Sequence, residues 1–193
     1  MENEKALIQK WNYKIYLISN IIISLAGGIF GPFYILFIQQ KGKSLENFGM
    51  ALGFLIISQS LVAYLAGKYS DILGRKPILI AQGYLYAIVI LFYLFINQTW
   101  QLYFLQVVNG LIEGLGISVA PSLLADITET KERGKLIGKY KALIGIVSAI
   151  AMMASGYLAA FTGITTLFII MALAQIIATS LLFFIKEERN QPA

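Results

Sequence analysis

The sequence contains no cysteine and no histidine, and only 13% of its residues are charged. Without cysteine, the chain can form no disulfide bond, thiolate metal site or cysteine nucleophile. Without histidine, the most common proton shuttle and metal ligand is also missing. We therefore expect no metal site and no cofactor. We also expect no enzymatic activity, because no constellation of serine, lysine and carboxylate residues stands out.

Hydrophobic residues make up 58% of the 193 residues and gather in six long runs. A helix needs roughly 20 mainly apolar residues to cross the hydrocarbon layer, and each run reaches that length. The runs lack polar alternation, and an unpaired strand edge is not tolerated in lipid. The sequence therefore predicts an all-α membrane protein, a single domain of six transmembrane helices over residues 1–193. The predicted spans are residues 13–38, 47–66, 77–96, 99–124, 139–161 and 164–185.

The basic residues predict the orientation of these spans. An even number of spans places both termini on the same side, and of the 15 lysine and arginine residues only Lys41 and Lys43 fall on the other side. The positive-inside rule then predicts a multi-pass protein of the cell membrane with both termini in the cytoplasm. The net charge of +5 reports this topology, so we expect lipid and not nucleic acid as the partner.

A glycine-punctuated, charged sequence separates the second and third predicted spans. It reads GKYSDILGRKP, and its characteristic residues are Gly67, Asp71, Gly74, Arg75 and Lys76. The pattern resembles the signature loop of the major facilitator superfamily, which has the same order of glycine, aspartate, glycine and two basic residues. The family carries this loop at the same place, between its second and third spans.

A second charged group follows the fourth predicted span and resembles another cytoplasmic cluster of the family. Its residues are Asp126, Glu132 and Arg133. Other positions depart from the family pattern. Gln106 stands where many members have an arginine, residues 150–156 lack the proline of many proton-linked antiporters, and residues 186–189 lack the sugar-porter motif. The sequence therefore lacks the usual markers of drug antiporters and also those of sugar porters.

The resemblance implies a secondary transporter that moves a small solute by alternating access, with proton-coupled efflux as one form. It covers one six-helix half of the usual twelve-helix protein, whose two halves are parallel repeats around the substrate. Three alternatives remain open. The chain pairs with a copy of itself or with a sister half, it is the N-terminal half of a longer transporter, or it is a non-transporting membrane subunit that binds a partner.

The resemblance also implies that the signature loop acts as a conformational latch. Asp71 is expected to pair with Arg75 and to face the N-terminal end of a helix in the opposite half, a contact worth about 0.3–1 kcal/mol near the surface. Gly67 and Gly74 are expected to permit backbone turns and close approach. Alternatively, Arg75 and Lys76 only anchor the turn to anionic lipid headgroups.

Glu113 is the acidic residue that falls near the middle of a predicted span. Gln106, Asn109 and Glu113 recur at helical spacing, so the fourth span has one polar face. The resemblance implies that the first and fourth helices line a central cavity, which this face would meet. No lysine or arginine lies at the same depth, so the carboxyl group either takes a proton or faces water. Proton coupling and a protonated packing contact between helices are both consistent with the pattern.

Two further polar residues near mid-span are candidates for the same cavity, Asn20 in the first span and Gln59 in the second. Each is equally consistent with a hydrogen bond between helices. Gln82 and Gln175 lie in the third and sixth spans, which the family usually turns toward lipid. The resemblance therefore places these two glutamines away from the cavity.

Overall fold

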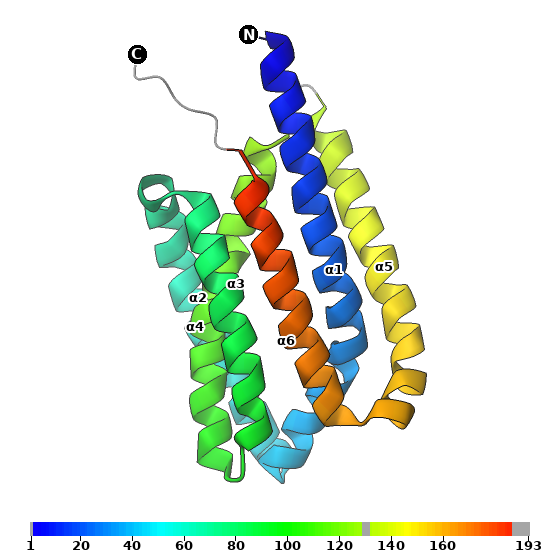
Figure 1. Cartoon of the computed structure of the whole chain (residues 1–193). Helices are drawn as coiled ribbons and strands as arrows, with labels where there is room; N and C mark the ends of the chain where they lie inside the picture. Colours follow the sequence, from blue (N-terminus) through cyan, green and yellow to red (C-terminus); the bar gives the residue numbers. More distant parts are fainter. Residues whose placement is uncertain (1, 129–131, 187–193) are drawn as a thin grey trace.

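The computed structural model describes residues 2–128 and 132–186, and within these ranges it consists of six long helices and two short 3-10 turns (Figure 1). All six helices are long and apolar enough to cross a membrane, which confirms the predicted six-helix bundle. The elements are α1 (Glu2–Gly42), α2 (Leu45–Leu73), α3 (Arg75–Phe92), η1 (Tyr93–Phe95), α4 (Thr99–Asp126), α5 (Arg133–Thr162), α6 (Ile164–Leu181) and η2 (Leu182–Phe184).

α1, α2, α4 and α5 extend beyond the predicted spans, whereas α3 and α6 end earlier and continue as the 3-10 turns η1 and η2. The difference is most visible at the signature loop. Apart from Gly74, residues 67–77 are helical, because α2 continues to Leu73 and α3 begins at Arg75. Gly74 adopts φ +87°, a conformation that favours glycine, and its N–H donates to Ser70 O at 3.0 Å. Gly67, by contrast, lies inside α2 and makes no turn. Hydropathy detects only the apolar part of a helix, whereas the backbone continues until a residue such as Gly74 ends it.

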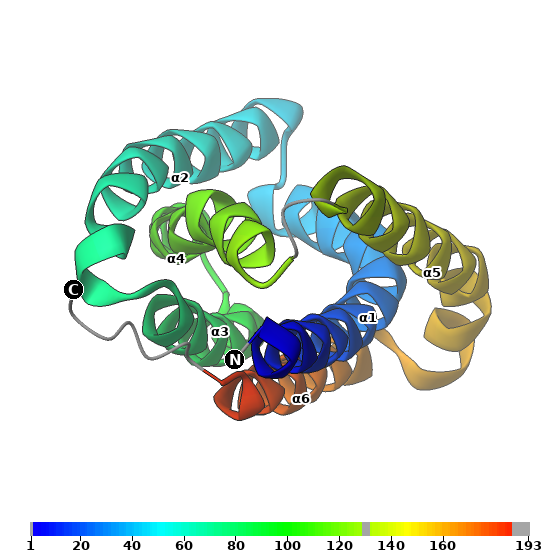
Figure 2. The same ribbon diagram turned by 90° about the horizontal axis from the view of Figure 1, so that it is seen from above.

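The six helices form a curved row (Figure 2). α1 packs against α5 and α6, α3 packs against α4 and α6, and α2 packs against α4, so α2 and α5 lie at the two ends of the row. The start of α1 and the end of η2 lie at the same end of the bundle, which we call the terminal end (Figure 1). The α2–α3 connection, the end of α4 and the start of α5 lie at this end too, and the α1–α2, α3–α4 and α5–α6 connections lie at the opposite end.

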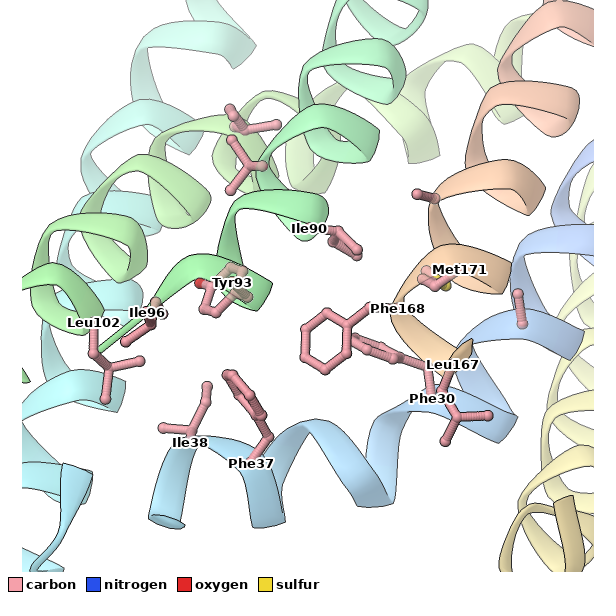
Figure 3. Packing of buried hydrophobic residues seen from close by; sticks show 14 of the residues in the cluster. Phe30, Phe37, Ile38, Ile90, Tyr93, Ile96, Leu102, Leu167, Phe168 and Met171 are labelled. Carbon is pink, nitrogen blue, oxygen red and sulfur yellow. The ribbon is translucent and has the colours of Figure 1, made fainter. Parts of the chain in front are cut away.

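Two apolar clusters hold the row together. The cluster nearer the opposite end, which we call the aromatic cluster, contains four buried aromatic rings among aliphatic side chains. In it Phe168 of α6 meets Phe30 and Phe37 of α1 edge-on, with ring centroids 4.8 and 4.9 Å apart (Figure 3). Edge-to-face pairs at such distances add to the stabilisation from burial. The second cluster lies nearer the terminal end and includes Tyr16, Leu79, Val119, Leu123 and Leu182. Between the clusters the bundle is hollow.

Candidate functional site

A cavity of about 460 Å³ lies inside the bundle, between the two apolar clusters. Its walls come from α1, α2, α3, α4 and α6, and they include Met171 of the aromatic cluster and Tyr16, Leu79 and Leu182 of the other. The polar residues that line it are Ser19, Asn20, Gln59, Gln82, Glu113, Gln175 and Thr179, together with the hydroxyls of Tyr16 and Tyr86. Many hydrogen-bonding groups therefore converge in the middle of an otherwise apolar bundle.

Glu113 projects from α4 and is held by two carboxamide groups. Gln59 Nε2 of α2 donates to Glu113 Oε2 at 2.9 Å, and Asn109 Nδ2, one turn earlier on α4, donates to Oε1 at 3.2 Å. A carboxamide carries both a donor and an acceptor, so either residue can serve an ionised or a protonated carboxyl group after its amide rotates. The geometry thus accommodates both protonation states of Glu113.

The contact between Glu113 and Gln59 depends on the close approach of α2 and α4. At Gly110 a Cβ atom would lie 2.0 Å from Ser58 Oγ and 2.4 Å from Leu55 O, so only glycine fits there. Small residues commonly allow such close helix pairs in membranes. The position of Gly110, one turn from Glu113, therefore brings the carboxyl group within reach of α2.

A hydrogen-bonded chain extends from Asn109 toward the opposite end of the bundle. Asn109 Nδ2 contacts the Tyr34 hydroxyl at 3.4 Å, and Tyr34 and Tyr93 both donate to Gln106 Oε1, at 3.0 and 2.9 Å. Tyr93 and Gln106 are fully buried. The predicted polar face of α4 is thus assembled as one network with Glu113. The sequence did not indicate that Tyr34 and Tyr93 belong to this network, and the available signal was that each is a tyrosine inside an apolar run.

Gln106 and Asn109 each keep one polar atom without a partner among the described residues, Nε2 and Oδ1 respectively. Both side chains are almost completely buried, at 0% and 2% exposure. Buried polar atoms are normally hydrogen-bonded to protein or to ordered water. These two atoms therefore leave one donor and one acceptor of the network to be satisfied by another group.

Asn20, Gln82 and Gln175 also line the cavity. Asn20 donates to Tyr16 O of its own helix at 2.8 Å. The lipid-facing placement inferred for Gln82 and Gln175 is wrong: the Gln82 carboxamide lies beside Gly116 of α4, and Gln175 is 95% buried. The cause is that α3 and α6 form part of the cavity wall, to which each contributes polar residues, Gln82 and Tyr86 from α3 and Gln175 and Thr179 from α6.

Among the residues that the structure describes, the cavity is lined by a single carboxyl group, that of Glu113, and by no lysine or arginine. Within residues 2–128 and 132–186 there is also no group of three or more aspartate or glutamate residues that could hold a metal ion. A solute in this cavity would meet hydrogen-bonding groups and one acidic group.

Arg75 joins three helices at the terminal end. Its Nη2 lies 2.7 Å from Asp71 Oδ1 at the end of α2, and its Nη1 contacts Asp126 at the end of α4 and also donates to Ser122 O at 3.2 Å. The side chain of Asp71 remains 68% exposed beyond this contact. The expected pairing of Asp71 with Arg75 is thus present in the geometry, and one face of the carboxylate stays accessible.

Lys76 lies beside the end of α6. Its Nζ donates to Ile185 O at 2.7 Å and to Phe183 O at 3.1 Å, carbonyls that a helix end leaves unpaired. A cation at a helix C-terminus also interacts favourably with the helix dipole. Lys76 thus caps the end of the sixth span. This contact is a role in addition to the two expected from the sequence, a part in the latch or an anchor to lipid headgroups.

The three residues of the second charged cluster do not form one group. Asp126 pairs with Arg75, whereas Glu132 contacts Lys135 of its own helix at 3.4 Å. Arg133 lines a polar hollow of about 850 Å³ at the terminal end, together with residues 70–77 and Asp126. The signature sequence and the α4–α5 connection are therefore neighbours in space.

Known proteins resemble this chain over most of its length. The chain is 31% identical to the MFS-type transporter YitZ of Bacillus subtilis over 160 residues, which are 83% of this chain and 93% of that protein. It is 27% identical to Multidrug resistance protein 2 of Bacillus subtilis over 97% of this chain and 48% of that protein. It is 24% identical to the class B tetracycline resistance protein of Escherichia coli over 92% of this chain and 45% of that protein.

The chain thus spans about half the length of the drug-resistance relatives that it matches and nearly all of YitZ. The sequence profile of the Major Facilitator Superfamily matches residues 16–193, which include most of the first span, all of the other five and the signature sequence. The expected membership is confirmed, and the chain is a multi-pass membrane protein that belongs to the Major Facilitator Superfamily.

Proposed function

We propose that this chain moves a small solute across the membrane by alternating access, in exchange for a proton carried by Glu113. The observation that carries the proposal is the Glu113 carboxyl group in the cavity, held by Gln59 and Asn109 and with no basic residue among the described residues of the lining. An ionisable group in such a position is costly unless it has a function or a neutralising proton.

The direction we propose is efflux. Relatives of the chain carry the names of multidrug and tetracycline resistance proteins. Gln106 and the proline-free α5 depart from common antiporter patterns. However, Glu113, the acidic group that proton exchange needs, is linked to Gln106 through Asn109 and Tyr34 in one hydrogen-bonded network.

We further propose that the terminal end faces the cytoplasm and that the transporting unit contains two six-helix halves. The positive-inside rule supports the orientation, since the basic residues gather at the terminal end. The outward faces of α2 and α5 support the pairing, because they expose large apolar side chains at the two ends of the row. These include Ile57, Leu61, Ile146, Ile150 and Met153.

The second half is another copy of this chain, a separate chain, or a following part of a longer protein. YitZ, which this chain covers almost entirely, favours a copy, whereas the drug-resistance relatives are about twice as long. A parallel pair with a two-fold axis would place Asp71 of one half near α5 of the other. Its accessible carboxylate could then act as the latch that the signature sequence implies.

Proteoliposomes test the exchange directly. Tetracycline serves as the first solute, and a pH-sensitive dye follows proton movement after its addition. Native protein and the Glu46→Gln variant, which alters an exposed carboxylate of α2, should both move protons. The Glu113→Gln variant should not move them, and native-like proton movement in Glu113→Gln would overturn the role of this residue.

A further inference from the structure

Asn109 is the branch point of the network around Glu113. Its Nδ2 donates to Glu113 Oε1 at 3.2 Å and contacts the Tyr34 hydroxyl at 3.4 Å, whereas its Oδ1 has no partner among the described residues. We infer that Asn109 and Tyr34 form a relay that passes the protonation state of Glu113 to the aromatic cluster. Both act as positioning residues. The relay rests on the function proposed for Glu113 and adds how its proton is sensed elsewhere in the bundle.

The amide of Asn109 has two orientations that satisfy equal numbers of its polar atoms. In the structure, Nδ2 has two acceptors and Oδ1 has none of its donors, an arrangement that suits an ionised Glu113. A protonated Glu113 donates through its own hydroxyl, and a rotated amide presents Oδ1 to that donor and to the Tyr34 hydroxyl. Asn109 is 2% exposed, so bulk water does not satisfy the remaining atom in either case. The proton on Glu113 therefore decides between the two orientations.

The Tyr34 hydroxyl has a single hydrogen and three polar neighbours. It lies 3.0 Å from Gln106 Oε1, 3.1 Å from the Tyr93 hydroxyl and 3.4 Å from Asn109 Nδ2. While Asn109 donates to it, Tyr34 donates toward Gln106 or Tyr93. When Asn109 presents its oxygen instead, Tyr34 donates to Asn109 and its bond to Gln106 is lost. Protonation of Glu113 thus moves the Tyr34 hydrogen bond from one turn of α4 to the next.

Tyr34 also packs against the aromatic cluster. Its ring centroid lies 5.3 Å from that of Phe30 and 5.5 Å from that of Tyr93, two buried members of the cluster (Figure 3). Pro32, two residues earlier in α1, has no N–H, so the helix lacks one backbone hydrogen bond there and bends more easily. A change at the Tyr34 hydroxyl therefore reaches the rings that lie between the cavity and the opposite end.

Glu113 is the group that sets the relay at cellular pH. Around the cavity, α1 contributes the titratable group of Tyr16 and α3 that of Tyr86, whereas the described lining residues of α2 and α6 contribute none. Tyr34 and Tyr93 are the titratable groups within the hydrogen-bonded chain. Tyrosine hydroxyls ordinarily ionise at about pH 10, so they keep their hydrogens while Glu113 gains or loses its proton.

Infrared difference spectroscopy of the full chain purified in detergent follows both ends of the relay. A pH step should give the carboxyl C=O band of Glu113 together with a tyrosine band, because tyrosine C–O modes respond to hydrogen bonding of the hydroxyl. Tyr34→Phe should remove the tyrosine band and retain the carboxyl band. Tyr157→Phe, at a position of α5 that is 77% exposed, is the matched control and should retain both. Glu113→Gln should remove both.

Asn109→Leu tests the branch point, and it should lose the tyrosine band while the carboxyl band persists. Asn109→Ala replaces this variant if it fails to elute as a folded species. A carboxyl band without a tyrosine band in the native chain, or a tyrosine band that survives in Tyr34→Phe or in the Asn109 variant, would overturn the relay and leave proton binding by Glu113 intact. A native chain with no carboxyl band that depends on Glu113 would overturn the proposed function itself.

Discussion

Gln59 Nε2 lies 2.9 Å from Glu113 Oε2, and this contact links α2 to α4 in the middle of the bundle. The pairing is not a salt bridge, so it does not fix Glu113 in its ionised form. A carboxamide can donate to a carboxylate and, after rotation, accept from a carboxylic acid. An arginine or lysine at position 59 would hold the charged form alone. Residue 59 therefore suits a carboxyl group that must bind and release a proton in each transport cycle.

Gln59→Met should impair proton exchange while preserving the bundle. Methionine has a similar volume but offers no donor of comparable strength, and a hydrogen bond to a charged group contributes about 1.5–3 kcal/mol. We expect proton movement in liposomes to fall about tenfold or more, with unchanged membrane insertion. Gln39→Met at the exposed end of α1 is the control, and native rates in Gln59→Met would show that the contact has no part in exchange.

Gly110→Ala should destabilise the protein by separating α2 from α4. The new methyl group would lie 2.0 Å from Ser58 Oγ and 2.4 Å from Leu55 O, a backbone atom that cannot rotate away. Overpacking of this kind typically costs about 1–3 kcal/mol. Thermal unfolding in detergent measures the effect. Gly27→Ala, where nothing lies within 4 Å, should unfold at the native temperature, and equal behaviour of the two variants would contradict the close packing.

Variants of Asp71 and of Arg75 should differ in their effects, because the first should slow transport and the second should lower the stability of the protein. Asp71→Asn removes an ion pair whose carboxylate is 68% exposed, so stability should change by less than about 1 kcal/mol. Transport should nevertheless slow severalfold if the accessible face of Asp71 contacts the second half. Arg75→Gln removes contacts to the ends of α2 and α4 and should cost about 1–3 kcal/mol. Unchanged uptake kinetics in Asp71→Asn would remove the latch.

A pair of cysteine variants should detect the two-fold assembly, because the native sequence has no cysteine to interfere. Leu61 of α2 and Ile146 of α5 are exposed and lie at similar depths, about three turns from the terminal end. Co-expressed Leu61→Cys and Ile146→Cys chains should form a disulfide-linked dimer under mild oxidation. Leu61→Cys with Leu173→Cys of α6 should not, and equal yields would argue against an α2–α5 interface.

The six spans could be predicted from sequence because lipid leaves few alternatives to a helix for a long apolar run. The polar face of α4 could also be predicted, since Gln106, Asn109 and Glu113 recur at helical spacing. The roles of Gln82 and Gln175 could not, because hydropathy shows that α3 and α6 are apolar but not that each turns its single glutamine inward. The partners of Lys76 were equally hidden, as they are backbone carbonyls more than a hundred residues away.

The central claim is that Glu113 binds and releases a proton within the range of cellular pH gradients. Infrared difference spectroscopy of the purified chain tests it without knowledge of the solute, because a protonated carboxyl group has its own C=O stretching band. Spectra recorded across that pH range should contain a band that Glu113→Gln removes and Glu46→Gln retains. Identical spectra for the native chain and Glu113→Gln would contradict the account.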